Sequence, residues 1–163
     1  MKSVQSIPNK IFSPDSLQQQ LKRWRLLNRK IVFTNGVFDI LHEGHIASLS
    51  DAAAAGNVLI VGVNADASVK RLKGESRPVN NENSRALVLA SLVMTDAVII
   101  FEEDTPYNLI TAIMPDVLVK GGDYTIETIV GAKEVIANGG EVIVAPILEG
   151  FSTTSIIERM KAK

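Results

Sequence analysis

Residues 31–45 read Ile31-Val32-Phe33-Thr34-Asn35-Gly36-Val37-Phe38-Asp39-Ile40-Leu41-His42-Glu43-Gly44-His45, and this stretch decides the fold. Its apolar start predicts a buried strand, and the residues that follow it, from 46 to 55, have the composition of a helix. Glycine at positions 36 and 44 allows the backbone to turn tightly between the two. The stretch therefore predicts a strand that runs through a short turn into the start of a helix.

The only two histidines of the chain lie three residues apart in this turn. Residues at that spacing share one face of a helix, so His42 and His45 are expected to point at one target. Free amides and the helix dipole favour anions at a helix start, which predicts a phosphate-binding site. Two other interpretations stay open: a zinc site completed by Asp39 or Glu43, since zinc needs three or four ligands, and a surface pair without function.

Composition excludes several classes of protein. The 163 residues suffice for one domain with a core, which is aliphatic because 46% of residues are apolar and only 5% aromatic. A net charge of -1 gives no reason to expect a nucleic-acid partner. The absence of cysteine excludes a disulfide scaffold and a thiol nucleophile. No secretory signal or membrane-spanning run is recognisable, so we expect a cytoplasmic protein with no membrane partner.

Strand and helix patterns alternate along the rest of the chain. Short aliphatic runs such as Val58-Leu59-Ile60-Val61 suit parallel strands that are covered on both faces. This order predicts a Rossmann-like, doubly wound, parallel five-stranded α/β sheet with helices on both faces. Residues 1–29 are expected to form an extension with a basic helix that starts at Ser13 and Pro14, and residues 30–163 the main domain. Strands are expected at 30–35, 57–63, 96–101, 116–119 and 141–146, and further helices at 42–55, 66–72, 82–94, 105–114, 129–138 and 153–162.

Loops that follow the strands are the expected ligand site, because such sheets bind ligands beyond the carboxyl ends of their strands. Besides the histidine turn, these loops contain Asn64 and Asp66, then Lys120-Gly121-Gly122-Asp123-Tyr124, and finally Ser152-Thr153-Thr154. The hydroxyl run also fits simple capping of a helix, and the double glycine also fits a plain turn. Their position in the sheet favours a shared site.

Basic residues gather between positions 70 and 85. Several cations beside a histidine pair suit a triphosphate, although a solvated surface loop has a similar composition. The last of them begins a helix that otherwise has core character, so its charge is expected to have a defined partner. The cluster consists of Lys70, Arg71, Lys73, Arg77 and Arg85.

Two motifs resemble those of the cytidylyltransferase-like nucleotidyltransferases. Gly36-Val37-Phe38-Asp39 with His42-Glu43-Gly44-His45 resembles the first signature of that family, and Glu149-Gly150-Phe151-Ser152-Thr153-Thr154 resembles the second. Within the family, the segments 33–42, 68–74, 77–80 and 115–124 are most similar to adenylyltransferases that act on a heptose 1-phosphate. The resemblance extends over about residues 30 to 160.

This resemblance implies a reaction. ATP and D-glycero-β-D-manno-heptose 1-phosphate would give ADP-heptose and pyrophosphate for lipopolysaccharide core synthesis, with Mg²⁺ on the triphosphate. No protein side chain is assigned firmly as a metal ligand. A homodimer is also implied. The alternatives are a glycerol-3-phosphate cytidylyltransferase and a nucleotide-binding module without catalysis.

The resemblance also assigns roles to residues. Catalytic roles are expected for His42, His45, Lys70 and Asp39, the last orienting a histidine or helping to hold magnesium. Nucleotide binding is expected for Thr34, Asn35, Gly36, Phe38, Gly44, Lys73, Arg85, Lys120, Gly121, Gly122, Asp123, Ser152, Thr153 and Thr154. Binding of the second substrate is expected for Asn64, Asp66, Arg77 and Tyr124.

Overall fold

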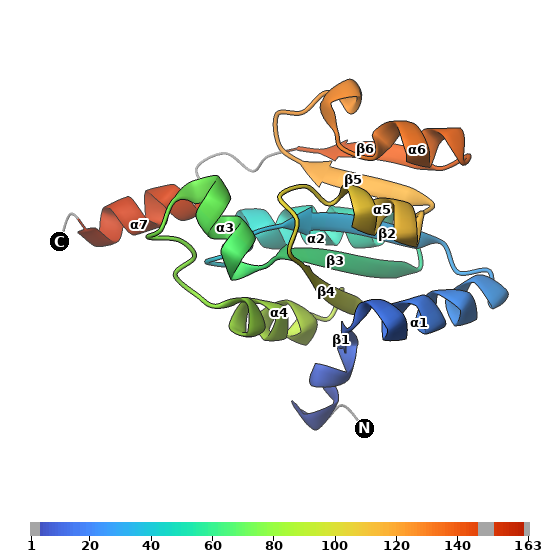
Figure 1. The fold of residues 1–163 in the computed structure, drawn as a ribbon, viewed down its shortest axis with the longest axis horizontal. Coiled ribbons are helices and arrows are strands. Elements are labelled where there is room, and N and C mark those ends of the chain that lie inside the picture. Colours follow the sequence, from blue (N-terminus) through green and yellow to red (C-terminus); the bar gives the residue numbers. More distant parts are fainter. Residues whose placement is uncertain (1–3, 147–151, 162–163) are drawn as a thin grey trace.

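The computed structural model describes residues 4–146 and 152–161. Within them a six-stranded, fully parallel sheet forms the centre of the molecule (Figure 1). The order across the sheet is β1-β4-β3-β2-β5-β6. The strands are β1 (Ile11–Phe12), β2 (Ile31–Gly36), β3 (Val58–Asn64), β4 (Ala97–Phe101), β5 (Val117–Gly121) and β6 (Glu141–Ala145).

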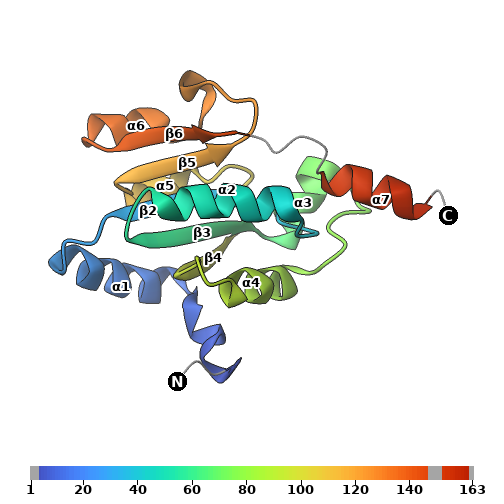
Figure 2. The same cartoon turned by 180° about the vertical axis from the view of Figure 1, so that it is seen from behind.

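Helices cover both faces of the sheet (Figures 1 and 2). One face carries α1 (Pro14–Leu26), α5 (Tyr107–Ile113) and α6 (Ala132–Ala137), and the other carries α2 (Glu43–Ala54) and α4 (Glu82–Ser91). At the carboxyl edge of the strands lie α3 (Asp66–Lys73) and α7 (Thr153–Lys161). Three short 3₁₀ turns complete the described chain: η1 (Val4–Ser6), η2 (Pro8–Lys10) and η3 (Ile126–Thr128). No helix in this part of the chain is long and apolar enough to cross a bilayer.

Two apolar layers form the core, one on each side of the sheet. In β2, Ile31 and Phe33 point into the layer under α1 and α5, while Val32 points into the layer under α2 and α4. All seven residues of β3 are buried, which is typical of a parallel strand covered on both faces. The predicted doubly wound α/β fold is therefore confirmed.

The sheet has one strand more than the sequence predicted. Ile11 and Phe12 form β1 and pair with Val98 and Ile99 of β4. A strand of two residues is too short to give an alternating pattern, so periodicity could not reveal it.

The N-terminal helix packs tightly onto the sheet. Ser13 caps α1 by accepting a hydrogen bond from the Ser16 amide, and Pro14 occupies the first turn, as the sequence predicted. Leu17 and Leu21 are each only 1% exposed and belong to the core. The segment expected as an extension thus contributes a helix and a strand to the main body of the protein.

The sheet opens between β2 and β5. All six residues of β2 pair with β3, whereas only Val32 and Phe33 of β2 pair with β5. The chain winds from β2 through β3 to β4 in one direction and places β5 and β6 on the other side. This is the topological switch point of the sheet, where doubly wound folds bind their ligands.

Candidate active site

Two adjoining cavities lie at the carboxyl edge of the sheet. The larger has a volume of about 690 Å³ and is walled by the ends of β2, β3 and β5, the loop after β4 and the start of α7. The smaller, of about 280 Å³, lies against the start of α2 and the end of β5. Their common wall, which we call the junction, consists of Asn35, Gly36, Val37, Phe38, His42, His45, Lys120, Gly121 and Tyr124.

The two histidines meet at the junction. His42 is the N-cap residue of α2 and His45 lies in its first turn. Their rings stack with centroids 3.9 Å apart and planes 26° apart. The Phe38 ring contacts His45 edge-on, with centroids 5.3 Å apart. This confirms the expectation that both imidazoles lie together at a helix start.

Burial keeps both imidazoles neutral near pH 7. It lowers the pKa of His42, and it lowers the pKa of His45 to about 4, with a smaller contribution from the charge of His42. A neutral imidazole still offers one N–H donor. The buried Nδ1 of His45 has no hydrogen-bond partner among the described residues. Such a group is typical of sites that bind a ligand or an ordered water.

The backbone before the histidines is held in a strained conformation. Phe38 has a φ of 49°, in the left-handed region that a phenylalanine seldom adopts. On one side, the Val37 carbonyl accepts a 2.7 Å hydrogen bond from Arg85. On the other, Asp39 is bound by several donors. A Cβ at Gly36 would lie 3.0 Å from the Phe38 ring, so glycine makes room for it. This local network presses the ring against His45.

Asp39 anchors the segment 77–80. Its side chain is fully buried and accepts hydrogen bonds from Arg77 Nε at 2.7 Å and from the amides of Val79 and Asn80. Burial alone would raise the pKa of this carboxyl, but the hydrogen bonds from Asn80, Val79 and Arg77 outweigh it and lower the pKa. These contacts differ from the expected contact with a histidine or magnesium, because they engage both carboxylate oxygens.

Carboxylates already pair with three cations of the predicted basic cluster. The pairs are Arg71–Asp104, Arg77–Asp39 and Arg85–Asp66, each at 2.7 Å. Arg85 is only 2% exposed and does not line either cavity, so its contact with nucleotide stays a prediction. The expectation of a defined partner for its charge is confirmed.

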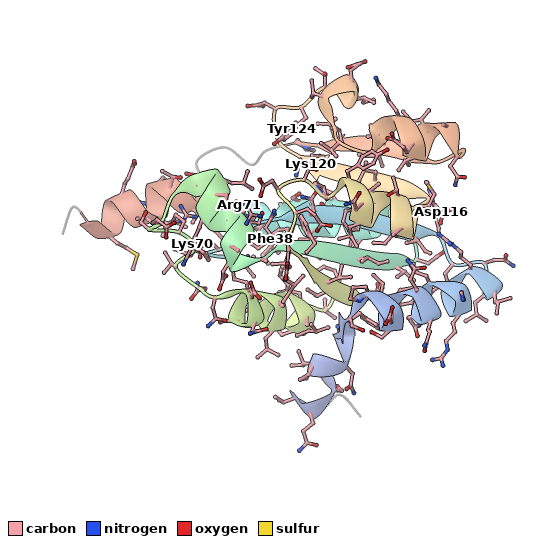
Figure 3. The ribbon with its side chains drawn as sticks, in the orientation of Figure 1. Phe38, Lys70, Arg71, Asp116, Lys120 and Tyr124 are labelled. Atoms are coloured by element: carbon pink, nitrogen blue, oxygen red, sulfur yellow. The ribbon has the colours of Figure 1, made fainter. Side chains whose placement is uncertain are left out.

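Of the two lysines in the cluster, only Lys73 lines the larger cavity. Lys70 is exposed and lies outside both cavity walls, so the structure does not bring it to the histidines, and its catalytic role stays a prediction. Figure 3 shows Lys70 and Arg71 on α3, apart from Lys120 and Tyr124 near the end of β5. Lys73 is the last residue of α3, and this end of the helix lies at the larger cavity.

The hydroxyl residues 152–154 both cap the start of α7 and line the larger cavity. Ser152 Oγ accepts a hydrogen bond from the Ser155 amide at the start of α7, and Thr153 Oγ1 donates to the Ile40 carbonyl at 3.4 Å. Ser152, Thr153 and Thr154 all line the larger cavity, facing the histidine turn. The three preceding motif residues, Glu149, Gly150 and Phe151, lie outside the described residues.

The remaining predicted residues divide between the cavities. Asn64 and Arg77 line the larger one, and Thr34, Gly44 and Gly122 the smaller. Asp66 and Asp123 line neither. Sequence reasoning missed Leu72, Thr105, Pro106, Thr128, Ile129 and Val130 in the larger cavity, and Ser48 and Pro146 in the smaller. Thr105 and Pro106 follow β4, so the rule that selected the other loops could have found them.

No group of three or more histidine, aspartate or glutamate side chains is placed to hold a metal ion within residues 4–146 and 152–161. Asp39, the third ligand considered for zinc, is engaged by Arg77 and two amides. The donors at the junction are instead imidazole, ammonium and amide groups, which suit an anion.

The geometry defines the class as a doubly wound parallel α/β domain with a cleft at its switch point that is lined by hydrogen-bond donors. The chain belongs to the cytidylyltransferase-like family, whose model matches residues 33–159. It is similar to the bifunctional protein HldE of Nitrobacter winogradskyi, with 60% identity over 90% of this chain and 30% of that protein. The HldE of Rhodospirillum rubrum is 52% identical over 96% of this chain and 32% of its own length. The chain thus spans about a third of these relatives.

Solved structures show the same fold. The lipopolysaccharide core biosynthesis protein from Thermoplasma volcanium matches with a TM-score of 0.59 and 30% identity, over 74% of this chain and 97% of that one. A pantoate-beta-alanine ligase from Francisella tularensis matches with a TM-score of 0.61 over 93% of this chain and 76% of its own. The ligase is 16% identical, so it supports the fold alone.

Proposed function

We propose that this protein is an adenylyltransferase that joins ATP and D-glycero-β-D-manno-heptose 1-phosphate into ADP-heptose and pyrophosphate. The observation that carries the proposal is the stacked pair His42 and His45 at the junction of two adjoining cavities. Together the two cavities can take the nucleotide and the sugar phosphate. The choice of ATP and heptose rests on the resemblance of segments 68–74, 77–80 and 115–124, and the similarity to HldE supports it.

The reaction needs no nucleophile from the protein. A phosphate oxygen of the sugar forms a bond to the α-phosphorus of ATP, and the bond from that phosphorus to the oxygen bridging to the β-phosphate breaks. Pyrophosphate leaves with that electron pair. The attacking oxygen already carries negative charge, so catalysis consists of alignment and stabilisation of charge in the transition state.

The residues divide this work. Neutral His42 and His45 donate hydrogen bonds to oxygens of the reacting phosphate, assisted by the amides at the start of α2. Lys73 and the hydroxyl groups of residues 152–154 bind the β- and γ-phosphates from the larger cavity. Asn64 and Arg77 lie where they can contact the sugar phosphate.

Magnesium enters this proposal with the nucleotide. Since the described side chains provide no cluster of three metal ligands, we propose that the triphosphate oxygens hold Mg²⁺. We also propose a cytoplasmic homodimer in which residues 30–163 form the nucleotidyltransferase domain. Size-exclusion chromatography with light scattering tests the dimer.

Pyrophosphate release tests the function directly. The purified protein is supplied with ATP, CTP or GTP, each with β-heptose 1-phosphate or glycerol 3-phosphate. We expect release with ATP and the heptose alone. Release with CTP and glycerol 3-phosphate instead would identify a glycerol-3-phosphate cytidylyltransferase, and ATP binding without any release would identify a non-catalytic module.

Variants of the histidines test the mechanism. His42→Ala and His45→Ala should each lower kcat by about 10²–10³, the usual cost of one lost transition-state donor. Lys133→Met is the matched control, because Lys133 is exposed on α6 and outside both cavities. Wild-type turnover in both histidine variants would contradict the mechanism.

A further inference from the structure

The junction contains one lysine. Lys120 is the penultimate residue of β5 and lies across the open end of the sheet from β2. Its Nζ donates to the carbonyl oxygen and Oδ1 of Asn35, at 3.4 and 3.3 Å. It also lies 5.5 Å from the centroid of the Tyr124 ring. Because β2 and β5 stop pairing after Phe33, the ammonium bridges the gap that forms the junction.

This ammonium has no carboxylate partner among the described residues. The oxygens that it contacts are uncharged, and the Tyr124 ring can offer only a cation–π interaction. A half-buried cation without a counter-charge is costly to maintain, and an anionic ligand removes that cost. Burial also lowers the pKa of Lys120, because removal from water disfavours its charged form.

Other cations near the site are engaged or distant. Arg77 and Arg85 are bound to aspartates, and Lys73 lines the larger cavity only. Both histidines of the junction are neutral near pH 7 because burial lowers the pKa of each. Lys120 is therefore the one side chain of the junction, within the described residues, that carries a full positive charge.

We propose that Lys120 is a catalytic residue whose ammonium contacts the phosphate of the acceptor where it meets the α-phosphate of the nucleotide. The inference rests on the proposed function and refines the nucleotide-binding role that the sequence suggested for this residue. Two anions must approach within bonding distance there, and a cation between them offsets their repulsion. The site accordingly selects acceptors that carry a phosphate, since a neutral hydroxyl acceptor would leave the ammonium unpaired.

The first test measures turnover. Lys120→Met removes the charge but retains a chain of similar length, and it should lower kcat by about 10²–10³. The affinity for ATP, measured by calorimetry without acceptor, should change by less than about threefold, because other groups bind the triphosphate. Lys133→Met serves as the matched control. Lys120→Ala should recover turnover when ethylammonium is added, which a purely structural role would not allow.

The second test measures binding and does not depend on turnover. Wild-type protein should bind β-heptose 1-phosphate more tightly than unphosphorylated heptose. In Lys120→Met the ratio of the two Kd values should fall by about 10- to 100-fold, which corresponds to the loss of one charge-assisted hydrogen bond. Thermal unfolding checks that both variants fold, and if Lys120→Met does not, Lys120→Gln replaces it.

The outcomes separate the two proposals. If the wild-type protein releases no pyrophosphate with any substrate pair, the proposed function fails, while the binding test still decides the role of Lys120. If the wild-type protein is active but Lys120→Met keeps its kcat and its preference for the phosphorylated sugar, the inference about Lys120 is overturned and the function stands.

Discussion

At the scale of single residues, pairing decides which charges can serve a ligand. The sequence offered five basic residues between positions 70 and 85, and aspartates from distant segments engage three of them. Arg85, expected to bind nucleotide, donates to the Val37 carbonyl, and Asp39, expected to act in catalysis, accepts from Arg77. Both contacts hold the histidine turn in place. The site therefore offers the neutral imidazoles of two histidines and the ammonium groups of two lysines, while the buried pairs of Arg77 and Arg85 with aspartates support its backbone.

The pair Asp39–Arg77 should be important for stability. Asp39→Ala leaves the half-buried Arg77 guanidinium and two amides without their acceptor, so we expect a loss of about 3–5 kcal/mol in the free energy of unfolding. Urea denaturation measures it. Arg71→Met is the matched control at an exposed pair, where the side chains are 51% and 50% exposed, and should cost less than about 1 kcal/mol. Equal losses in both variants would contradict this interpretation.

His45 should make stability depend on pH. Burial lowers its pKa from 6.5 to about 4, so between these values the unfolded chain binds a proton that the folded protein does not. Stability is therefore retained above pH 6.5 and falls as the pH decreases toward 4. Thermal unfolding at pH 7 and pH 4.5 measures the decrease. It should be smaller in His45→Gln, and an equal decrease in that variant would assign the effect to other groups.

At the scale of elements, periodicity predicted most of the fold. Within residues 4–146 and 152–161, five of the six strands and all seven α-helices have counterparts in the sequence pattern. The two-residue β1 gave no such signal. Contacts across long sequence separations, such as Asp39 with Arg77 or Arg85 with Val37, could not be predicted, since a single sequence does not specify which loops meet.

The N-terminal helix should be part of the cooperative core. Leu21 is 1% exposed, so Leu21→Ala creates a cavity between α1 and the sheet and should cost about 2–5 kcal/mol in the free energy of unfolding. Leu26→Ala is the matched control on the same helix, because Leu26 is 83% exposed, and should change stability by less than about 0.5 kcal/mol. A small effect at position 21 would show that α1 can separate from the domain.

At the scale of the whole molecule, the switch point explains why distant motifs form one site. The sequence rule that ligands bind beyond the strand ends brought together the histidine turn, residues 120–124 and residues 152–154, and all three line the cavities. It could not separate Lys73 from Lys70, because that difference depends on where α3 ends relative to the cavity. Nor did it reveal Thr128, Ile129 and Val130, which follow no recognisable motif.

Ligand binding should stabilise the entire fold, because the cavities draw on segments from β2 to α7. ATP at 100 times its Kd should raise the free energy of unfolding by about 2.7 kcal/mol. Thermal unfolding with and without ATP measures this change. Adenosine at the same concentration is the control and should give a much smaller increase, since it lacks the phosphates that the junction is proposed to bind. An equal increase in stability with ATP and with adenosine would show that the nucleoside, and not the phosphates, provides the binding energy.

The shortness of β1 has a consequence for the protein in crowded solution. Ile11 and Phe12 cover only the part of β4 around Val98 and Ile99, yet they block the start of that edge to any foreign chain. An uncovered, flat, aliphatic edge is a template for intermolecular pairing and aggregation. A segment too small to be seen in the sequence pattern thus shortens the length of β4 that is open to intermolecular pairing.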